Sequence, residues 1–295
     1  RVTMPAFAAD PTGYDAQDLV DDKEYVRGET KEVFQILKPL DTEALITDLK
    51  QLKEDGIDSV AIVFIHGYNY QEHEKQAGKI AKDLGFKHIS MSHEIFPVIK
   101  AVPRGQSTVV DAYLTPIIKD YIKSLLDGFE KGFEKHTRIE FIQSDGGLCS
   151  WEKFTGLKSL LSGPAGGVVG EAKTCYDADS KIPIIGFDMG GTSTDVSRYA
   201  GDFEFSFEST TAGIKIASPQ LDINTVAAGG GSILSYKNGI FIVGPESASA
   251  HPGPACYRKG GPLTITDANL FTGRILPEFF PKIFGPNEDQ PLDYE

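Results

Sequence analysis

Apolar residues in the first third of the chain alternate between the spacing of helices and that of strands. Residues 41–56 carry apolar positions three or four apart, which predicts a helix that stops at Gly56. The next run, SVAIVFIHG (59–67), is continuously apolar and predicts a strand buried on both faces. A helix is expected over 71–84, and KHISMSHEI (87–95) is expected to form a second strand. This order of elements predicts a largely parallel α/β sheet.

The middle of the chain carries a long helical pattern and then a glycine-rich part. The pattern over 109–133 predicts one long helix, in which Pro116 should introduce a kink. Its apolar side would consist of Leu114, Ile117, Ile118, Tyr121, Ile122 and Leu125. We then expect a strand in RIEFIQSDGGL (138–148), a helix in SGPAGGVVGEA (162–172) and a buried strand in KIPIIGFDMGG (181–191).

The last third is predicted to be richer in strands. Beyond Thr192 an alternating pattern predicts antiparallel strands joined by a hairpin at Ala200–Asp202. The alternating apolar residues are Val196, Phe203, Phe205 and Phe207. The final stretch, rich in proline, has no periodic pattern. Along its whole length the chain therefore predicts an α/β fold with both parallel and antiparallel pairing.

The composition is that of an ordinary globular protein, and it narrows the choice of partners. Of 295 residues, 40% are hydrophobic and 24% are charged. A formal net charge of −13 disfavours binding to nucleic acid or to an anionic membrane, because both carry negative charge. Neither a long apolar span nor a signal peptide is visible, and the start at Arg1 suggests a processed or excised piece. Three widely spaced cysteines without a CxxC pattern argue against disulfides and zinc modules, and favour a cytoplasmic protein.

The segment IPIIGFDMGGTSTDVS carries the most specific candidate site. Gly190 and Gly191 permit backbone angles that are closed to other residues, so successive amide N–H groups can form a concavity for phosphate oxygens. Thr192, Ser193 and Thr194 complete the turn, and the two threonines add hydroxyl donors. The pattern predicts a phosphate-binding loop at the end of a strand. The alternative is a plain tight turn whose polar side chains satisfy its own backbone.

Two aspartates flank this turn. Asp188 ends the strand and could hold Mg²⁺, directly or through water, or orient an attacking water. Asp195 could do the same from the other side of the turn. Both are candidates for catalysis, and Asp188 is the candidate metal ligand.

Two other turns are weaker candidates. Gly229, Gly230 and Gly231 could form part of a nucleotide pocket, since glycine lets a ligand approach the backbone closely, or they could be a flexible connector. Residues 144–147 (SDGG) end a strand and could face a ligand cleft, or could form a plain turn.

Reactive or metal-binding side chains elsewhere carry less weight. Cys256, with His251 nearby, could be a nucleophile and its base, but the surrounding prolines favour a rigid loop. The spacing of His66, His73 and Glu74 matches no standard metal site, so a helix-cap and surface role is predicted for the EHE triplet.

Several segments resemble known proteins. The turn after Asp188 resembles the second phosphate motif of the actin, sugar kinase and heat-shock chaperone ATPase superfamily, in which a DxGGT turn lies between antiparallel strands. SGPAGGVVGEA resembles that superfamily's small-residue hinge helix, except that Ser162 stands where the chaperones carry a carboxylate. More specifically, the chain resembles the 5-oxoprolinase and hydantoinase A family through eight segments: FIHGYNYQEHE, VPRGQSTVVDAYLTP, QSDGGL, SGPAGGVVG, GFDMGGTSTDVS, GGGS, VGPESASAHPGPACY and GGPLTITDANLFTGR.

The resemblance implies an actin-like, ribonuclease H-like ATPase fold, with mixed sheets and flanking helices, present here as a partial chain. Residues 1–104 would be the C-terminal part of the family's N-terminal domain, and 105–295 the N-terminal part of its ATPase domain. It also implies ATP and Mg²⁺ as cofactors, and hydrolysis of a cyclic amide, foremost 5-oxo-L-proline to L-glutamate. Asp188 and Asp195 would serve catalysis, and the two glycine turns would hold the nucleotide.

The family's first phosphate loop is not among these residues, so the resemblance also implies missing partners. These are the lobe that carries that loop and a hydantoinase B-like half, on the same chain or on a separate subunit; a homo-oligomer is also allowed. The chain by itself is expected to hydrolyse ATP poorly. A hydantoin-hydrolysing subunit and a non-catalytic nucleotide-binding module remain alternatives, because the sequence does not set the substrate.

Overall fold

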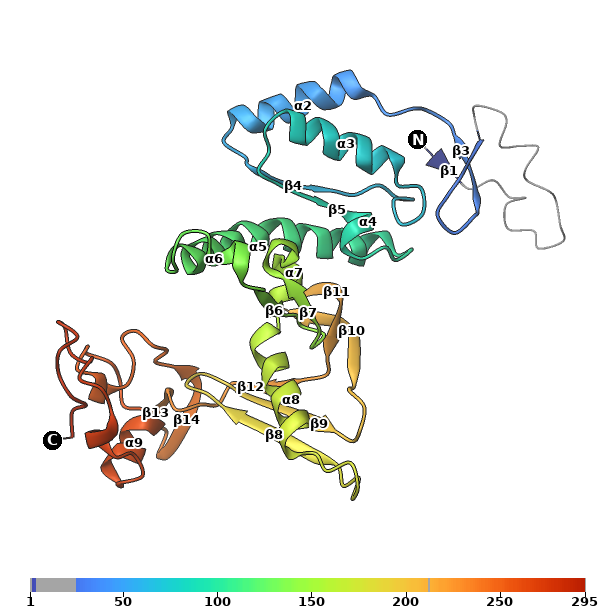
Figure 1. The fold of residues 1–295 in the computed structure, drawn as a ribbon. Coiled ribbons are helices and arrows are strands. Elements are labelled where there is room, and N and C mark those ends of the chain that lie inside the picture. The colour runs from blue at the N-terminus through green and yellow to red at the C-terminus, as the bar shows by residue number, and fades with distance from the viewer. Residues whose placement is uncertain (1, 4–24, 212, 295) are drawn as a thin grey trace. The chain divides into compact units, whose positions relative to one another are not determined.

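The computed structural model describes residues 2–3, 25–211 and 213–294 (Figure 1). The chain forms two compact units, each of which is described by itself. The first comprises Arg1–Gly163 and Phe205–Leu221, and the second comprises Pro164–Glu204 and Asp222–Glu295. The chain therefore passes between the units at residues 163/164, 204/205 and 221/222.

The first unit contains a strand, helix and strand in the predicted order. Helix α2 (Thr42–Glu54) is followed by β4 (Ser59–Ile62), α3 (Glu72–Asp83) and β5 (His88–Met91). Strands β4 and β5 are parallel, and Figure 1 shows α2 and α3 on one side of them and the long helix α5 on the other. The side chain of Asp41 caps α2, which ends before Gly56 at φ +83°, and this confirms the predicted helix.

The apolar run 59–67 forms a shorter and less buried strand than predicted. Only its first four residues are in β4, all of them half-buried, and the side chain of Ile65 is 74% exposed. The sheet has two strands only, so both are edge strands and neither is covered from all sides. The predicted second strand also ends early, because Ser92–Ile95 form the short helix α4.

Helix α5 (Ala101–Asp127) begins earlier than predicted and continues through Pro116. The prediction of its buried side was wrong: Ile117 and Tyr121 are 59% and 58% exposed, and of the predicted apolar side only Ile122 is fully buried. The buried positions are mostly polar, namely Arg104, Ser107, Thr108, Asp111 and Thr115, together with Ala112 and Ile122.

The polar side of α5 is buried because it binds backbone amides of neighbouring segments. Asp111 accepts a hydrogen bond from Leu157 N at 3.0 Å. Ser107 accepts one from Ala217 N at 2.8 Å. Each of these bonds satisfies a backbone donor that would otherwise be buried without a partner. Apolar periodicity alone does not predict this kind of packing.

The remaining elements of the first unit are short. They are β1 (Val2–Thr3), β2 (Tyr25–Arg27) and β3 (Val33–Ile36) in one antiparallel sheet, the helices α6 (Phe133–His136) and α7 (Gly156–Ser159), the 3₁₀ turn η2 (Trp151–Lys153), the hairpin β6 (Glu140–Ile142) and β7 (Leu148–Ser150), and the antiparallel pair β10 (Phe205–Thr211) and β11 (Ile214–Leu221).

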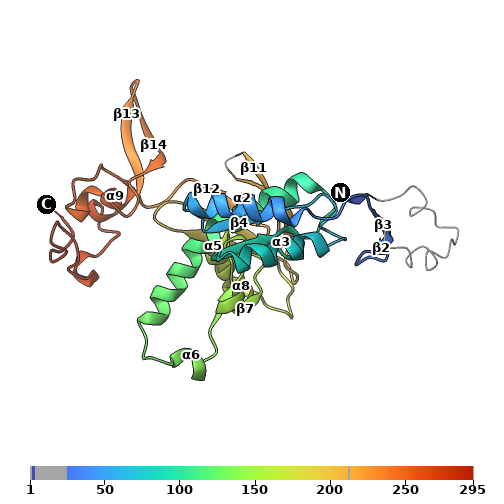
Figure 2. The ribbon, with the colours of Figure 1, turned by 90° about the horizontal axis from the view of Figure 1, so that it is seen from above.

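The second unit is built around a three-stranded antiparallel sheet. Its strand order is β12 (Asn224–Val226), β9 (Thr194–Tyr199), β8 (Ile184–Met189), and the predicted helix is α8 (Ser162–Cys175). Figure 2 shows the separate hairpin of β13 (Ser232–Lys237) and β14 (Ile240–Ser247) beside the short helix α9 (Ile265–Phe271). The other elements are the 3₁₀ turns η3 (Ala255–Tyr257) and η4 (Pro277–Phe279).

Two predictions for this unit were wrong. Strand β9 pairs with β8 and β12, whereas β10 pairs with β11, so the predicted hairpin at Ala200–Asp202 does not form. Alternation identifies strands but not their partners. Strand β8 is also not buried: Ile185 and Phe187 are 74% and 66% exposed, because they point to the face opposite Gly186, and Gly186 is the residue that faces α8.

Within the described part of the chain, no helix combines the length and apolar character needed to cross a lipid bilayer. All three cysteines are unpaired. The predicted α/β class, with mixed sheets and flanking helices, is confirmed.

Candidate functional site

The predicted phosphate loop connects β8 to β9. Gly190 N donates a hydrogen bond to Ser193 O at 2.9 Å, which closes the turn. Among the described residues, none accepts a hydrogen bond from the backbone N–H groups of Gly191, Thr192 or Ser193. Three successive amide donors are therefore left without a partner in this part of the chain and can bind a ligand. The expected left-handed backbone angles do not occur, since neither Gly190 nor Gly191 has a positive φ.

The second glycine turn packs directly against this loop. Gly230 N donates to Gly190 O at 3.0 Å, and Gly231 N donates to Gly191 O at 2.6 Å. A Cβ atom at Gly229 would lie 2.7 Å from the carbonyl carbon and oxygen of Gly191, which is closer than real contacts allow. The structure thus brings together two segments that sequence analysis identified separately, and at Gly229 only glycine permits the backbones to approach this closely.

The second glycine turn is also fixed from its other side. Gly230 O accepts hydrogen bonds from Thr266 N at 2.7 Å and from Thr266 Oγ1 at 2.9 Å. Ala248 N donates to Gly231 O at 2.8 Å. Thr194 Oγ1 donates to Ala228 O at 2.6 Å, so this buried hydroxyl joins the two segments. A flexible connector would lack such bonds, and the turn is a rigid support for the loop.

Asp188 and Asp195 are directly opposite each other in the antiparallel register of β8 and β9. Both line a cavity of about 10 Å³ that also borders Glu171 and Gly167 of α8. That volume is about the room one water needs. Thr225 Oγ1 donates to Asp195 Oδ1 at 2.6 Å, which partly satisfies one carboxylate. Like charges opposite each other on a sheet are destabilising, so a bound cation here would be favourable.

Small residues allow α8 to approach the sheet beside these carboxylates. A Cβ atom at Gly186 would meet Glu171 Oε2 at 1.6 Å, so a larger residue there would displace the Glu171 side chain. Ser197 Oγ donates to the same Glu171 oxygen at 3.2 Å. The buried side of α8 consists of Ala165, Val168 and Ala172. The described residues contain no group of three or more His, Cys, Asp or Glu side chains suited to a metal ion.

The turn at residues 144–147 has a structural role. It joins β6 to β7 and is closed by Gln143 N donating to Gly147 O at 2.7 Å. The side chain of Ser144 is 1% exposed, donates to Lys158 O at 2.8 Å and accepts from Leu161 N at 2.9 Å. These bonds agree with the plain-turn alternative.

Cys256 is not an activated nucleophile. Burial, and then the hydrogen bond and charge of Asp267, raise the pKa of its thiol to about 12. The backbone N of Cys256 donates to Asp267 Oδ1 at 2.8 Å, and the side chain is in a core cluster with Leu270 and Phe284. A protonated thiol in an apolar core is inert, so the rigid-loop interpretation holds.

The surface role predicted for the EHE triplet holds for Glu72, which is exposed, and is wrong for His73 and Glu74, which are buried. Glu74 is completely buried and does not cap its own helix; it accepts hydrogen bonds from Phe64 N at 2.9 Å and from His93 N, in the first turn of α4, at 3.0 Å. His93 Nδ1 is 2.7 Å from the same carboxylate. A carboxylate so deep in a unit is costly unless every lone pair is satisfied, and here it ties a loop to α4.

Sequence analysis missed Arg104, which is completely buried on α5. Its guanidinium donates to Phe64 O at 2.7 Å and to Ile65 O at 2.9 Å. It also donates to Ser92 Oγ at 3.0 Å, and Ser92 in turn donates to Glu74. Arg104 and Glu74 therefore hold the loop after β4 from both sides. A single arginine among small and apolar residues at the start of α5 was the available signal.

Comparison with known proteins decides the family. The sequence model of the hydantoinase/oxoprolinase family matches residues 104–295, and that of its N-terminal region matches residues 11–85. The chain belongs to the hydantoinase/oxoprolinase family. The resemblance noted from the motifs is thereby confirmed.

Individual relatives are consistent with this assignment. The chain is 57% identical to a 5-oxoprolinase of Saccharomyces cerevisiae and 52% identical to 5-oxoprolinase 1 of Arabidopsis thaliana, over 100% and 92% of its own length. It is 36% identical to the caprolactamase subunit alpha of Pseudomonas jessenii over 80% of its length. It spans only 23%, 22% and 35% of these three relatives, respectively.

Solved structures share the fold. A nucleotide-free acetone carboxylase superposes with a TM-score of 0.69 at 22% identity, over 90% of this chain and 38% of that one. The ATP-dependent caprolactamase of Pseudomonas jessenii superposes with a TM-score of 0.60 at 30% identity, over 86% of this chain and 37% of that one.

Proposed function

We propose that this chain supplies one side of the ATP site of an enzyme that hydrolyses 5-oxo-L-proline to L-glutamate, with release of ADP and phosphate. The observation that carries the proposal is the backbone contact between the two glycine turns, which leaves three adjacent amide donors beside two carboxylates. Curated relatives of 50–57% identity named 5-oxoprolinase support the choice of substrate.

The residues of the loop would have distinct roles. The N–H groups of Gly191, Thr192 and Ser193, with the Thr192 hydroxyl, would bind terminal phosphate oxygens. Gly190, Gly229, Gly230 and Gly231 would set the backbone shape, and Thr194 would hold the two turns together through Ala228.

The two aspartates would complete the site. Asp188 would hold Mg²⁺, and Asp195 would orient water from the opposite strand. Magnesium commonly uses one or two carboxylates together with substrate phosphates, so two aspartates are a sufficient protein contribution. The ion would neutralise charge that develops on the transferring phosphoryl group.

ATP is needed because an amide is a poor electrophile. Transfer of the terminal phosphoryl group to the amide oxygen makes the ring carbon open to attack by water. The C–N bond then breaks, the ring nitrogen takes a proton to become the amine, and a second water releases phosphate. The net reaction consumes ATP and two waters and yields L-glutamate, ADP and phosphate.

The proposal includes parts that this chain does not supply. The first phosphate loop and a hydantoinase B-like half would come from the rest of a longer protein or from a partner subunit, and the caprolactamase relative is named as a subunit alpha. We also propose a domain boundary near residue 104, which is where the family match begins. Three cysteines without a disulfide support a cytoplasmic setting.

The test is ATP turnover by the longer protein with and without 5-oxo-L-proline, hydantoin or caprolactam. We expect turnover that depends on 5-oxo-L-proline and is lost in Asp188→Asn. Stimulation by hydantoin alone would assign a hydantoin-hydrolysing subunit instead. Turnover or nucleotide binding indifferent to every ring would reject hydrolysis of a cyclic amide and favour the nucleotide-binding module. The 295-residue chain alone should hydrolyse ATP at least about a hundredfold more slowly, because one side of the phosphate clamp is missing.

A further inference from the structure

The first unit contains a cavity of about 300 Å³ that none of the roles above uses. It lies where the chain leaves β4, at the carboxyl end of a strand that is parallel to β5. This end of a parallel sheet is where ligands of α/β proteins usually bind. The volume is at the lower end of the range for sites that bind small organic molecules. The lining residues are Lys38, Pro39, Leu40, Asp41, Phe64, Ile65, His66, Tyr70 and His73.

The wall formed by the loop after β4 is held rigidly from behind. Arg104 donates to the carbonyl groups of Phe64 and Ile65, and Glu74 accepts from Phe64 N. Both charged side chains are completely buried. Burying a guanidinium and a carboxylate is costly, and here the network fixes a loop whose residue Ile65 is itself largely exposed. The wall is therefore preorganised, which reduces the entropy lost on binding a ligand.

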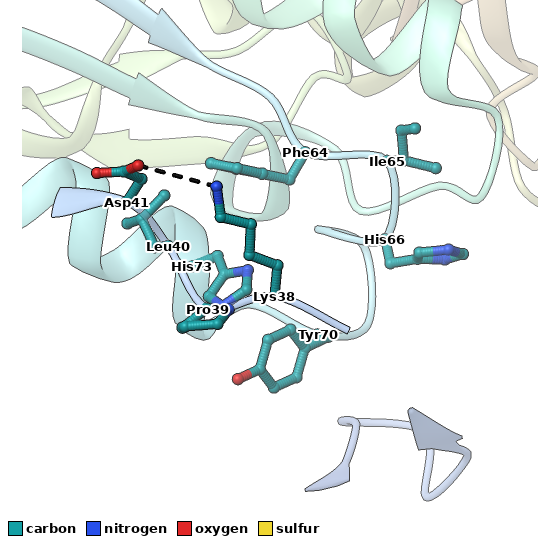
Figure 3. A pocket seen from close by; sticks show the side chains of 9 residues that line it. All are labelled: Lys38, Pro39, Leu40, Asp41, Phe64, Ile65, His66, Tyr70 and His73. Atoms are coloured by element: carbon teal, nitrogen blue, oxygen red, sulfur yellow. Dashed lines mark ion pairs between the residues drawn. The ribbon is translucent and has the colours of Figure 1, made fainter. Parts of the chain in front are cut away.

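The cavity has apolar walls and one polar edge, formed by the side chains of Tyr70 and His73. Figure 3 shows Lys38, Tyr70 and His73 gathered on one side of the loop, with Phe64 nearby and the ring of His66 turned away from them. The rings of Tyr70 and His73 meet edge to face at 5.2 Å. Burial raises the pKa of Tyr70 and lowers the pKa of His73, so at neutral pH the phenol is protonated and the imidazole is uncharged.

A neutral phenol and a neutral imidazole can each donate and accept a hydrogen bond. A cyclic amide presents one N–H donor and one C=O acceptor side by side, and its ring methylenes are apolar. At the rim, Lys38 Nζ lies 3.9 Å from Asp41 Oδ2 and both side chains are well exposed, so the charged groups of the cavity form an ion pair at its mouth rather than inside. These features fit a small lactam better than a nucleotide, whose phosphates would require several buried cations or amide donors.

We propose that this cavity binds the small cyclic amide, with the Tyr70 hydroxyl and the His73 imidazole at the amide edge and Leu40 and Phe64 against the ring. The identity of the ligand rests on the proposed function. Recognition of the ring and binding of ATP would then be carried by different units of the chain.

The test is isothermal titration calorimetry of the 295-residue chain with 5-oxo-L-proline and no nucleotide. Tyr70→Phe removes one hydroxyl and keeps the ring packing, and it should weaken binding about tenfold, the effect of one hydrogen bond. Leu40→Trp should fill the cavity and abolish binding. The matched controls are Tyr113→Phe and Leu37→Trp, at exposed positions outside the cavity, and both should bind as the unmodified chain does. No heat of binding in the unmodified chain, or unchanged affinity in either Tyr70→Phe or Leu40→Trp, would overturn the proposal.

A parallel titration with an ATP analogue separates this proposal from the function proposed above. Gly229→Ala should lose nucleotide and keep 5-oxo-L-proline, whereas Leu40→Trp should do the reverse. If the unmodified chain binds the ring but the longer protein does not bind ATP, the ATP site is wrong and the lactam cavity stands. If the longer protein binds ATP but the unmodified chain does not bind the ring, the lactam cavity is wrong and the ATP site stands.

Discussion

Replacing Gly229 with alanine should separate the two glycine turns. The added Cβ would lie 2.7 Å from the carbonyl carbon and oxygen of Gly191 and 2.8 Å from Gly190 O. All three atoms belong to the backbone, so no side chain can move aside. The bonds from Gly230 N and Gly231 N to this loop would lengthen or break. Two hydrogen bonds at about 1 kcal/mol each, with about 1 kcal/mol of overpacking strain, should lower the free energy of unfolding by about 3 kcal/mol.

Two measurements check this prediction. Urea unfolding of the 295-residue chain should show the lower free energy of unfolding, and titration with a fluorescent ATP analogue should show affinity weakened at least about tenfold. Gly170→Ala is the matched control, because a Cβ there meets nothing within 4 Å and alanine favours a helix. Wild-type stability and wild-type nucleotide affinity in Gly229→Ala would refute the claim that these turns support each other.

Three further predictions concern other parts of the chain. Arg104→Leu should lower the free energy of unfolding by about 3 kcal/mol, since it leaves the buried carboxylate of Glu74 without a cation; a loss below about 1 kcal/mol in urea unfolding would contradict this. An aromatic disulfide reagent at pH 8 should label exposed Cys175 and leave Cys256 unlabelled until the protein unfolds, because the thiol of Cys256 has a pKa of about 12. Hydrogen bonds from Lys53, and then from Lys87, lower the pKa of Asp58 from 3.8 to about 2. The stability that this carboxylate contributes is therefore present above about pH 4 and is lost as the pH falls through 2. Carboxyl NMR titration should give that midpoint, and Lys53→Met should move it upward.

Periodicity predicted the helices that have one apolar side and clear ends. Helix α2 was found because its apolar stripe is bounded by Asp41, whose side chain caps the first turn, and by Gly56, whose positive φ ends the helix. The buried side of α5 could not be found in this way. Its Ser107 and Asp111 are buried to satisfy amides more than 40 residues away in sequence, and no local pattern encodes those partners.

The candidate site likewise has features that the sequence predicts and features that it does not. The residue types in the two glycine turns were sufficient to single out both segments, and in the second turn the close approach of the backbones requires glycine. Their mutual hydrogen bonds join residues 40 apart and were not predictable from one sequence. Glu74 and Arg104 were misjudged or missed, because charged residues are rarely buried and a sequence does not show which ones have found partners.

At Gly229 the contact between the two glycine turns is made by backbone atoms alone, which limits how these segments can change. Where side chains touch, a larger residue on one side can be accommodated by a smaller one on the other. At Gly229 and Gly191 there is no side chain to shorten, so a second substitution has nothing to act upon. Revertants of a defective Gly229 variant should therefore restore glycine itself, or shift whole segments through changes at a distance.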